Sequence, residues 1–262
     1  MPLNFYNTPG LVVYVTCGDP DLATTRAVVL AAIKAGADVI ELGVPFSDPV
    51  ADGPVIQRAS ERALTHGTCL AQVLTLAADL RQHAQSTGLV VFSYLNPILR
   101  MGIGKFCRVA RHAGIDGVLV TDLPVEEAGE YLRAMKENRL SAVFLATPTS
   151  PDERLKRIAE ASRGFVYAVS RTGVTGASQQ LAGDAQKLVR RLRRVTKLPI
   201  AVGFGISTAE QFAEAGKFVD AVVVGSAIVE TIERNAGGEA EAVGEFVRKL
   251  SAVGHPRSAM TS

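Results

Sequence analysis

The sequence predicts an α/β fold, a single (β/α)₈ (TIM) barrel, and three observations predict it. Eight short apolar runs recur at fairly even intervals through the 262 residues. Several runs are apolar almost throughout, as expected for parallel strands that are buried on both faces. Helix-length segments with apolar residues at helical spacing lie between them. This alternation matches the eight-stranded barrel in count and in length, since such barrels typically take about 250 residues.

The predicted elements follow one another from the first apolar run to the last. The expected strands cover residues 11–16, 37–42, 89–94, 116–121, 141–146, 164–169, 198–203 and 220–225. Clear amphipathic helices are expected over 24–37, 106–114, 126–139, 152–162 and 184–196. Ser150 and Ser207 are the expected N-caps of the helices that follow them. Gly36, Gly114 and Gly164 stand where helices are expected to end. An open doubly wound sheet is the alternative arrangement of the same elements.

Composition limits the classes of function. No Pro/Gly/Ser-rich linker divides the chain, so we expect one barrel domain over residues 1–262 with a short frayed tail from residue 255. A net charge of +2 is too weak to indicate nucleic acid or an anionic membrane. The RRLRR stretch at 190–194 alternates with apolar residues and is typical of the wet face of a helix. We therefore expect neither a nucleic-acid nor a membrane partner.

Cysteine and histidine usage predicts no metal site and no secretion. The three cysteines include no CxxC pair, and the four histidines have no metal-ligand spacing. The first residues have no basic stretch or long apolar stretch, so no signal peptide is expected. No apolar run approaches the ~20 residues of a membrane span. These features favour a cytoplasmic protein.

The acidic loop ELGVPFSDPVADGPVIQ, residues 41–57, is the first candidate for chemistry. Barrels carry their reactive groups on the loops that leave the carboxyl ends of the strands. Glu41 ends a predicted strand among apolar neighbours, so desolvation should raise its pKa toward a useful acid/base range. Asp52 can reach over the barrel mouth from the proline-rich loop. The alternative is that these carboxylates, with Asp48, cap the next helix and pair with Arg58 or Arg62.

Three glycine-rich segments follow the later strands. GFGIS (203–207) and VGSAI (224–228) each place freed backbone N–H groups at the start of a helix, an arrangement that binds phosphate. Barrels often hold phosphate with the loops after strands seven and eight. SRTGVTGAS (170–178) indicates a mobile lid whose glycines absorb the closing motion. Plain tight turns and a flexible solvent loop are the alternatives for these segments.

Seven segments together resemble one family closely, the tryptophan synthase α subunits. They are VTCGDPD (15–21), IELGVPFSDPVADGPVIQ (40–57), NPI (96–98), VTDLPVEE (120–127), SRTGVTGA (170–177), GFGIS (203–207) and VGSAI (224–228). They span nearly the whole chain in order, and the second is highly specific. The resemblance implies a (β/α)₈ barrel that cleaves indole-3-glycerol phosphate to indole and glyceraldehyde 3-phosphate. This is a lyase reaction of tryptophan biosynthesis.

The resemblance also implies roles for individual residues. By its place in ELG, Glu41 matches the family's general acid/base, and by its place in ADGP, Asp52 matches the carboxylate that accepts the indole N–H. Arg171 and Thr175 of the lid are expected to brace Asp52. The residues expected to bind the phosphate are Gly176, Gly205, Gly225 and Ser226. The positions that wall the indole pocket are Tyr14, Phe92, Tyr94, Leu119, Leu145, Tyr167 and Phe204.

The implied partner is a tryptophan synthase β subunit, in an α₂β₂ complex that passes indole from α to β. The family's β subunit carries pyridoxal phosphate, whereas no cofactor and no metal are implied for this chain. A stand-alone indole-3-glycerol phosphate lyase, a non-catalytic activator of β and another phosphate-binding barrel are the alternatives. Two departures from the family pattern stand out. The short segment before residue 11 predicts a reduced or absent helix at the barrel floor, and Tyr14 and Cys17 replace an expected Phe and an aliphatic residue.

Overall fold

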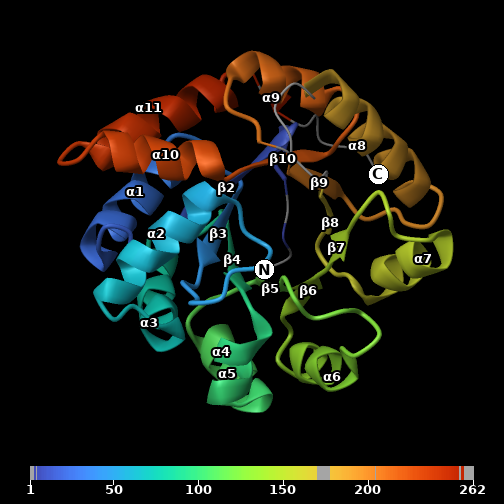
Figure 1. Ribbon diagram of the computed structural model, residues 1–262, viewed down its shortest axis with the longest axis horizontal. Helices are drawn as coiled ribbons and strands as arrows, with labels where there is room; N and C mark the ends of the chain where they lie inside the picture. Colours follow the sequence, from blue (N-terminus) through green and yellow to red (C-terminus); the bar gives the residue numbers. More distant parts are fainter. Residues whose placement is uncertain (1–2, 4, 170–177, 204, 254, 257–262) are drawn as a thin grey trace.

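The computed structural model describes residues 3, 5–169, 178–203, 205–253 and 255–256. Its main feature is a closed ring of parallel strands surrounded by helices (Figure 1). The strands of the ring are β2 (Gly10–Thr16), β3 (Val39–Gly43), β4 (Gly88–Ser93), β5 (Gly117–Val120), β6 (Ser141–Val143), β7 (Leu145–Ala146), β8 (Val166–Val169), β9 (Ile200–Gly203) and β10 (Ala221–Val224).

The order of the strands confirms the barrel and rules out the doubly wound sheet. The sheet runs β6-β5-β4-β3-β2-β10-β9-β8-β7, and each pair of neighbours is parallel. Its two ends, β6 and β7, are separated in the chain by Phe144 alone. The single strand expected over 141–146 is therefore split, with its first half paired to β5 and its second half to β8. That split strand closes the sheet on itself.

Helices form the outer ring of Figure 1. They are α1 (Leu22–Lys34), α2 (Pro54–Thr65), α3 (Leu70–Arg81), α4 (Leu95–Met101), α5 (Ile103–His112), α6 (Gly129–Glu137), α7 (Asp152–Ala161), α8 (Ser178–Leu192), α9 (Ala209–Gly216), α10 (Ser226–Arg234) and α11 (Glu239–Ser251). None of these helices, within the residues described, is long and apolar enough to cross a membrane.

Helix ends agree with the sequence prediction at the carboxyl side and differ at the amino side. Gly36, Gly114 and Gly164 adopt φ values of 107°, 77° and 82°, which glycine tolerates best. The N-cap predictions for Ser150 and Ser207 are wrong by one residue. Helix α7 follows Pro151 without a side-chain cap, and α9 is capped by Thr208, whose hydroxyl accepts from the Gln211 amide at 3.2 Å.

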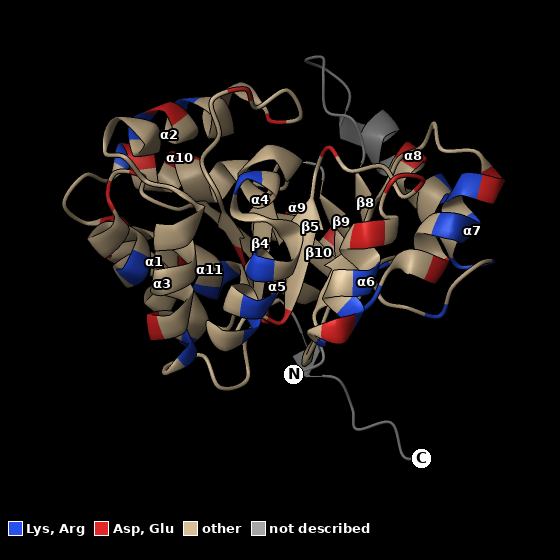
Figure 2. Cartoon of the chain, turned by 90° about the horizontal axis from the view of Figure 1, so that it is seen from below, with Lys and Arg blue, Asp and Glu red and all other residues tan. Residues whose placement is uncertain are grey.

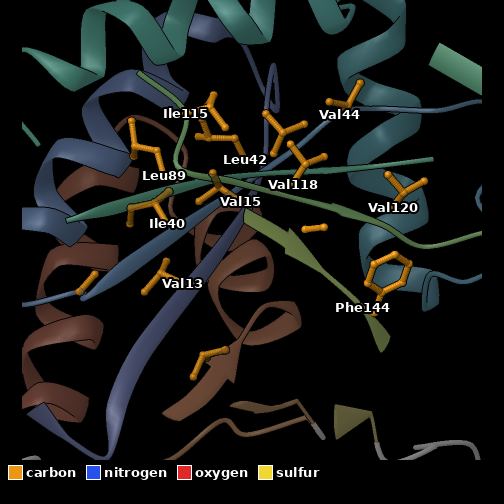
Figure 3. Close-up of a cluster of buried hydrophobic side chains, with 14 of the residues drawn as sticks. Val13, Val15, Ile40, Leu42, Val44, Leu89, Ile115, Val118, Val120 and Phe144 are labelled. Carbon is orange, nitrogen blue, oxygen red and sulfur yellow. The ribbon is translucent and has the colours of Figure 1, made fainter. Parts of the chain in front are cut away.

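Alternation along each strand separates two apolar layers. Side chains such as Val13, Ile40 and Val118 point outward into the core between strands and helices (Figure 3). Their neighbours Val12 and Val39 point inward and belong to a second cluster inside the barrel. Because successive side chains of a strand face opposite sides, Glu41 shares the inward face with Val39.

The described residues of the N-terminal segment close the floor of the barrel, and none of them is helical. Leu3 and Phe5 are almost fully buried in the interior cluster, and the ring of Phe5 lies 5.6 Å from that of Phe165. A Cβ on Gly88 or on Gly117 would lie within 3 Å of Leu3, so glycine there makes room for the plug. The prediction of a frayed tail is wrong for its first two residues. β11 (His255–Pro256) pairs antiparallel with β1 (Asn7–Thr8).

Three aspartates pin the amino ends of neighbouring strands. Asp38, Asp116 and Asp220 each directly precede a strand and accept a backbone N–H of the adjacent one, from Leu11 at 2.8 Å, Leu89 at 3.0 Å and Ile200 at 2.8 Å. These bonds fix the register at the floor. The opposite, carboxyl ends of the strands are left to the loops that carry the chemistry.

Candidate active site

Glu41 lies in the middle of β3 (Val39–Gly43), not at its end as predicted, and its side chain points into the barrel. In the strand register it stands opposite Tyr14 of β2 and Val90 of β4. It is 0% exposed, and neither carboxylate oxygen has a hydrogen-bond partner among the described residues. Burial raises its pKa to about 8. The predicted desolvation of this acid is confirmed, and at neutral pH the group holds its proton.

Asp52 lies in the loop between β3 and α2, and Tyr94 holds it there. The Tyr94 hydroxyl donates to Asp52 Oδ2 at 3.1 Å and accepts the Ala51 N–H at 2.9 Å. The ring of Phe46 stacks on that of Tyr94 at 4.9 Å. Partial burial raises the pKa of Asp52 to about 6, and the bond from Tyr94 opposes that rise. Asp52 is therefore mostly ionised at neutral pH, whereas Glu41 is mostly protonated.

The alternative role for the carboxylates, capping α2 or pairing with its arginines, is wrong for Glu41 and Asp52. Helix α2 begins after Gly53 without a side-chain cap. Arg58 and Arg62 pair with Glu233, and Arg62 also pairs with Asp19. Asp48 is exposed and accepts from the Ser47 hydroxyl at 2.6 Å, as a solvated loop acid does.

The predicted pocket walls lie together around the inner rim of the barrel. Leu119 belongs to the interior cluster and is buried. Against this cluster pack three partly exposed side chains, Phe92, Leu145 and Tyr167. The ring of Tyr14 meets that of Phe92 edge-on at 5.1 Å. These side chains come from five different strands and form one apolar surface with the interior cluster. Phe204 lies outside the described residues.

Two glycines make room for the tyrosines of the wall. A Cβ on Gly43 would lie 2.4 Å from the Tyr14 hydroxyl, and one on Gly203 would lie 2.7 Å from the Tyr167 hydroxyl. Burial raises the pKa of both phenols, and the charges of Glu41 and Asp52 raise it further. Both hydroxyl groups are therefore neutral, and they share one enclosure with the two carboxylates.

The two predicted phosphate loops differ in how free their N–H groups are. Gly205 has a φ of 71°, but helix α9 after it is already capped by Thr208, and the Ser207 N–H donates to Gln211 Oε1 at 2.9 Å. Helix α10 begins at Ser226 with Gly225 as N-cap and has no side-chain cap. Its first-turn N–H groups are the better anion donors. Arg171, Thr175 and Gly176 lie outside the described residues.

Sequence reasoning missed the contact between Tyr94 and Asp52. It placed Tyr94 in the pocket wall by resemblance, whereas the phenol also fixes the acidic loop. No local pattern reports this contact because the two residues are 42 positions apart. The ion-pair network of Asp19, Arg58, Arg62 and Glu233 was missed for the same reason, since its members come from three separate segments.

Comparison with known proteins gives consistent matches. The sequence family described as tryptophan synthase alpha chain matches residues 3–255. The chain is 53% identical to the tryptophan synthase alpha chain of Solibacter usitatus, over 88% of this chain and 86% of that protein. It superposes on a structure of Mycobacterium tuberculosis tryptophan synthase with a TM-score of 0.87 and 38% identity, covering 94% of this chain and 92% of that chain. A tryptophan synthase complex from Pyrococcus furiosus gives a TM-score of 0.85 with 37% identity, covering 95% and 100%.

Proposed function

Because the chain belongs to the tryptophan synthase alpha chain family, we propose that Glu41 and Asp52 carry the proton chemistry of the family's lyase reaction. That reaction cleaves indole-3-glycerol phosphate to indole and glyceraldehyde 3-phosphate. The observation that carries the proposal is the pairing of unlike acids. Glu41 is buried and without a partner among the described residues, while Asp52 is partly exposed and held by Tyr94. Their environments push their pKa values apart, which is how two carboxylates divide acid and charge-stabilising roles.

The cleavage needs one proton to be moved within the substrate. Glu41 enters as the neutral acid and gives its proton to C3 of the indole ring. As a carboxylate it then removes the proton of the glycerol hydroxyl next to the breaking bond. The electrons of that carbon–carbon bond return to the ring, the hydroxyl carbon becomes the aldehyde, and Glu41 regains its proton. Asp52 stays ionised, accepts the indole N–H and stabilises the positive charge that the ring carries after protonation.

The rest of the pocket orients the substrate between its two ends. The apolar wall formed by Tyr14, Phe92, Leu119, Leu145 and Tyr167 suits the flat indole ring. The phosphate is bound by backbone N–H groups at Gly225, Ser226 and Gly205, and the absence of a side-chain cap on α10 supports this assignment. The family pattern adds Gly176 and Phe204 to these two ends, with Arg171 and Thr175 in the lid.

The test of this function is the Glu41→Gln variant. Glutamine keeps the size of the side chain but cannot transfer the proton, so indole release from indole-3-glycerol phosphate should fall by about 10²–10⁴-fold. Circular dichroism of the variant checks that it is folded. A variant that folds and still cleaves at near the normal rate would overturn the assignment of Glu41.

We further propose that the chain works as the α component of an α₂β₂ complex and passes indole to a β subunit. Two apolar side chains support a docking face at the barrel mouth: Val50 in the acidic loop is 86% exposed, and Leu99 beside the NPI segment is 52% exposed. A groove of about 640 Å³ connects the two segments, lined on one side by Pro45 and Phe46 and on the other by Asn96 and Pro97. A buried Glu41 set for acid chemistry argues against a purely activating role.

A further inference from the structure

Four charged side chains form a network outside the substrate pocket. Glu233 of α10 accepts from Arg58 Nη2 at 3.3 Å and from Arg62 Nη1 at 2.8 Å, both on α2. Arg62 also donates two parallel hydrogen bonds to the Asp19 carboxylate, at 2.7 and 2.9 Å. The network therefore ties the loop after β2, helix α2 and helix α10 to one another. These helices lie next to each other in both views (Figures 1 and 2).

The two helices begin at opposite ends of the proposed site. Helix α2 starts at Pro54, directly after Asp52 and Gly53. Helix α10 starts at Ser226, where the phosphate is proposed to bind, and Glu233 lies two turns, about 10 Å, along it.

An apolar contact links the same pair of helices to the pocket wall. Ala59 of α2 and Val229 of α10 form a small buried cluster with Tyr14, and Val55 and Ile56 pack against it. Because of this contact, a displacement of one helix also displaces the other helix and Tyr14 of the pocket wall.

The ion pairs of this network differ in how deeply their acids are buried. Asp19 is only 3% exposed, so its charge needs Arg62, and Arg62 is thereby fixed in place. Glu233 is 34% exposed on its side chain and would be well solvated without a partner. Its pairs with Arg58 and Arg62 are not needed to satisfy a buried group, yet they join α10 to the fixed arginine. The pairs set the position of α10 relative to α2.

We propose that Glu233 is a positioning residue that couples phosphate binding at the start of α10 to the placement of Asp52 at the start of α2. The coupling rests on the proposed function, since it needs a phosphate at α10 and an indole beside Asp52. Phosphate that engages the first turn of α10 shifts that helix, and the arginines carry the shift to α2. Coupling between two ligands is reciprocal, so indole must favour phosphate as much as phosphate favours indole.

The experiment measures binding of indole with and without saturating glycerol 3-phosphate, a non-reactive phosphate probe. The chain contains no tryptophan, so the fluorescence of indole itself reports its binding. In the unaltered chain, glycerol 3-phosphate should tighten indole binding. In Glu233→Gln this enhancement should fall by about two- to fivefold, the size that partly exposed ion pairs can transmit. The affinity for each ligand alone should change little.

Two further variants make the result decisive. Asp79→Asn is the matched control, because it removes the Arg26–Asp79 pair between α1 and α3, at 42% exposure of both side chains, and should leave the enhancement intact. If Glu233→Gln fails to fold, Arg58→Gln removes one of the same pairs and leaves Arg62 on Asp19. An enhancement that is unchanged in Glu233→Gln, equally reduced in Asp79→Asn, or absent from the unaltered chain would overturn the coupling. A failure of the proposed function differs from all of these, because it would appear as normal cleavage by Glu41→Gln.

Discussion

Glu41 and Asp52 differ in what surrounds their carboxyl groups, and that difference sets their protonation. Glu41 sits on a strand inside the barrel, where the described residues offer it no donor, so burial alone determines its pKa. Asp52 sits on a loop with partial access to solvent and a phenol donor from Tyr94. The same residue class thus supplies a neutral acid and a charged group at one pH.

The activity should follow a bell-shaped pH profile. Because kcat/KM reports the free enzyme, it should rise as Asp52 ionises near pH 6 and fall as Glu41 loses its proton near pH 8. In Tyr94→Phe the hydrogen bond that lowers the pKa of Asp52 is gone, so the acidic limb should move to higher pH while the basic limb stays. Tyr6→Phe, at a side chain 51% exposed and far from the loop, is the control. An acidic limb that stays in place in Tyr94→Phe would remove Asp52 from this assignment.

The buried acid should also make folding stability depend on pH. The pKa of Glu41 rises from an ordinary 4.5 to about 8 in the folded chain, so between these values the folded state binds more protons than the unfolded state. The free energy of unfolding therefore falls as pH rises through this window. Glu41→Gln lacks the titration, so its melting temperature relative to the unaltered chain should be higher at about pH 8 than at about pH 5. Parallel changes in both chains would contradict the burial of an ionisable group here.

At the level of elements, strands were predictable and the residues that cap the helix starts were not. Strand runs such as LVVYVT are apolar because both of their faces are buried, so these strands can be recognised from the sequence. The caps of α7 and α9 are the last residues with extended backbone, Pro151 and Thr208, so Ser150 and Ser207 were each misplaced by one residue. The split of the strand at Phe144 depends on how the barrel closes, which no local pattern records.

The residues of the site could be predicted by motif and alternation, but their contacts could not. The inward direction of Glu41 follows from the period of its strand. Its lack of any described partner depends on which side chains the other strands place around it. The bond from Tyr94 to Asp52 and the network around Glu233 join distant segments, so they required the folded structure.

Helix α10 provides the element-scale prediction. A Cβ on Gly225 would meet Tyr14 at an ordinary 3.4 Å, and the φ of Gly225 is −117°, so a Cβ is accommodated without a positive φ. Valine there would instead keep phosphate away from the first turn. We expect KM for the substrate to rise at least about tenfold, since one hydrogen bond to a charged group is worth about 1.5–3 kcal/mol. Gly129→Val, at an open position in the first turn of α6, is the control. Equal KM values in the two variants would place the phosphate elsewhere.

The whole molecule separates stability from chemistry along the barrel axis. At one end, Leu3 and Phe5 plug the floor, and Asp38, Asp116 and Asp220 lock the strand starts. Glu41 lies midway along its strand, Asp52 lies on the loop at the other end, and the exposed Val50 and Leu99 stand at the rim. A partner that docks on this rim contacts the loop that carries Asp52, so docking and chemistry are linked by geometry.

Addition of a bacterial β subunit should therefore raise the rate of indole formation and produce a complex that co-sediments. A partner that favours the productive position of the Asp52 loop should contribute a coupling of about 1–3 kcal/mol, or roughly 5–150-fold. Leu99→Asp should weaken this association by placing a charge in the apolar rim, while the isolated chain keeps its activity. Val109→Asp is the matched control, because that side chain is 39% exposed on α5 and away from the rim. If the chain alone already cleaves at full speed and never co-sediments with β, it acts as a stand-alone lyase, and the exposed Val50 and Leu99 require another explanation.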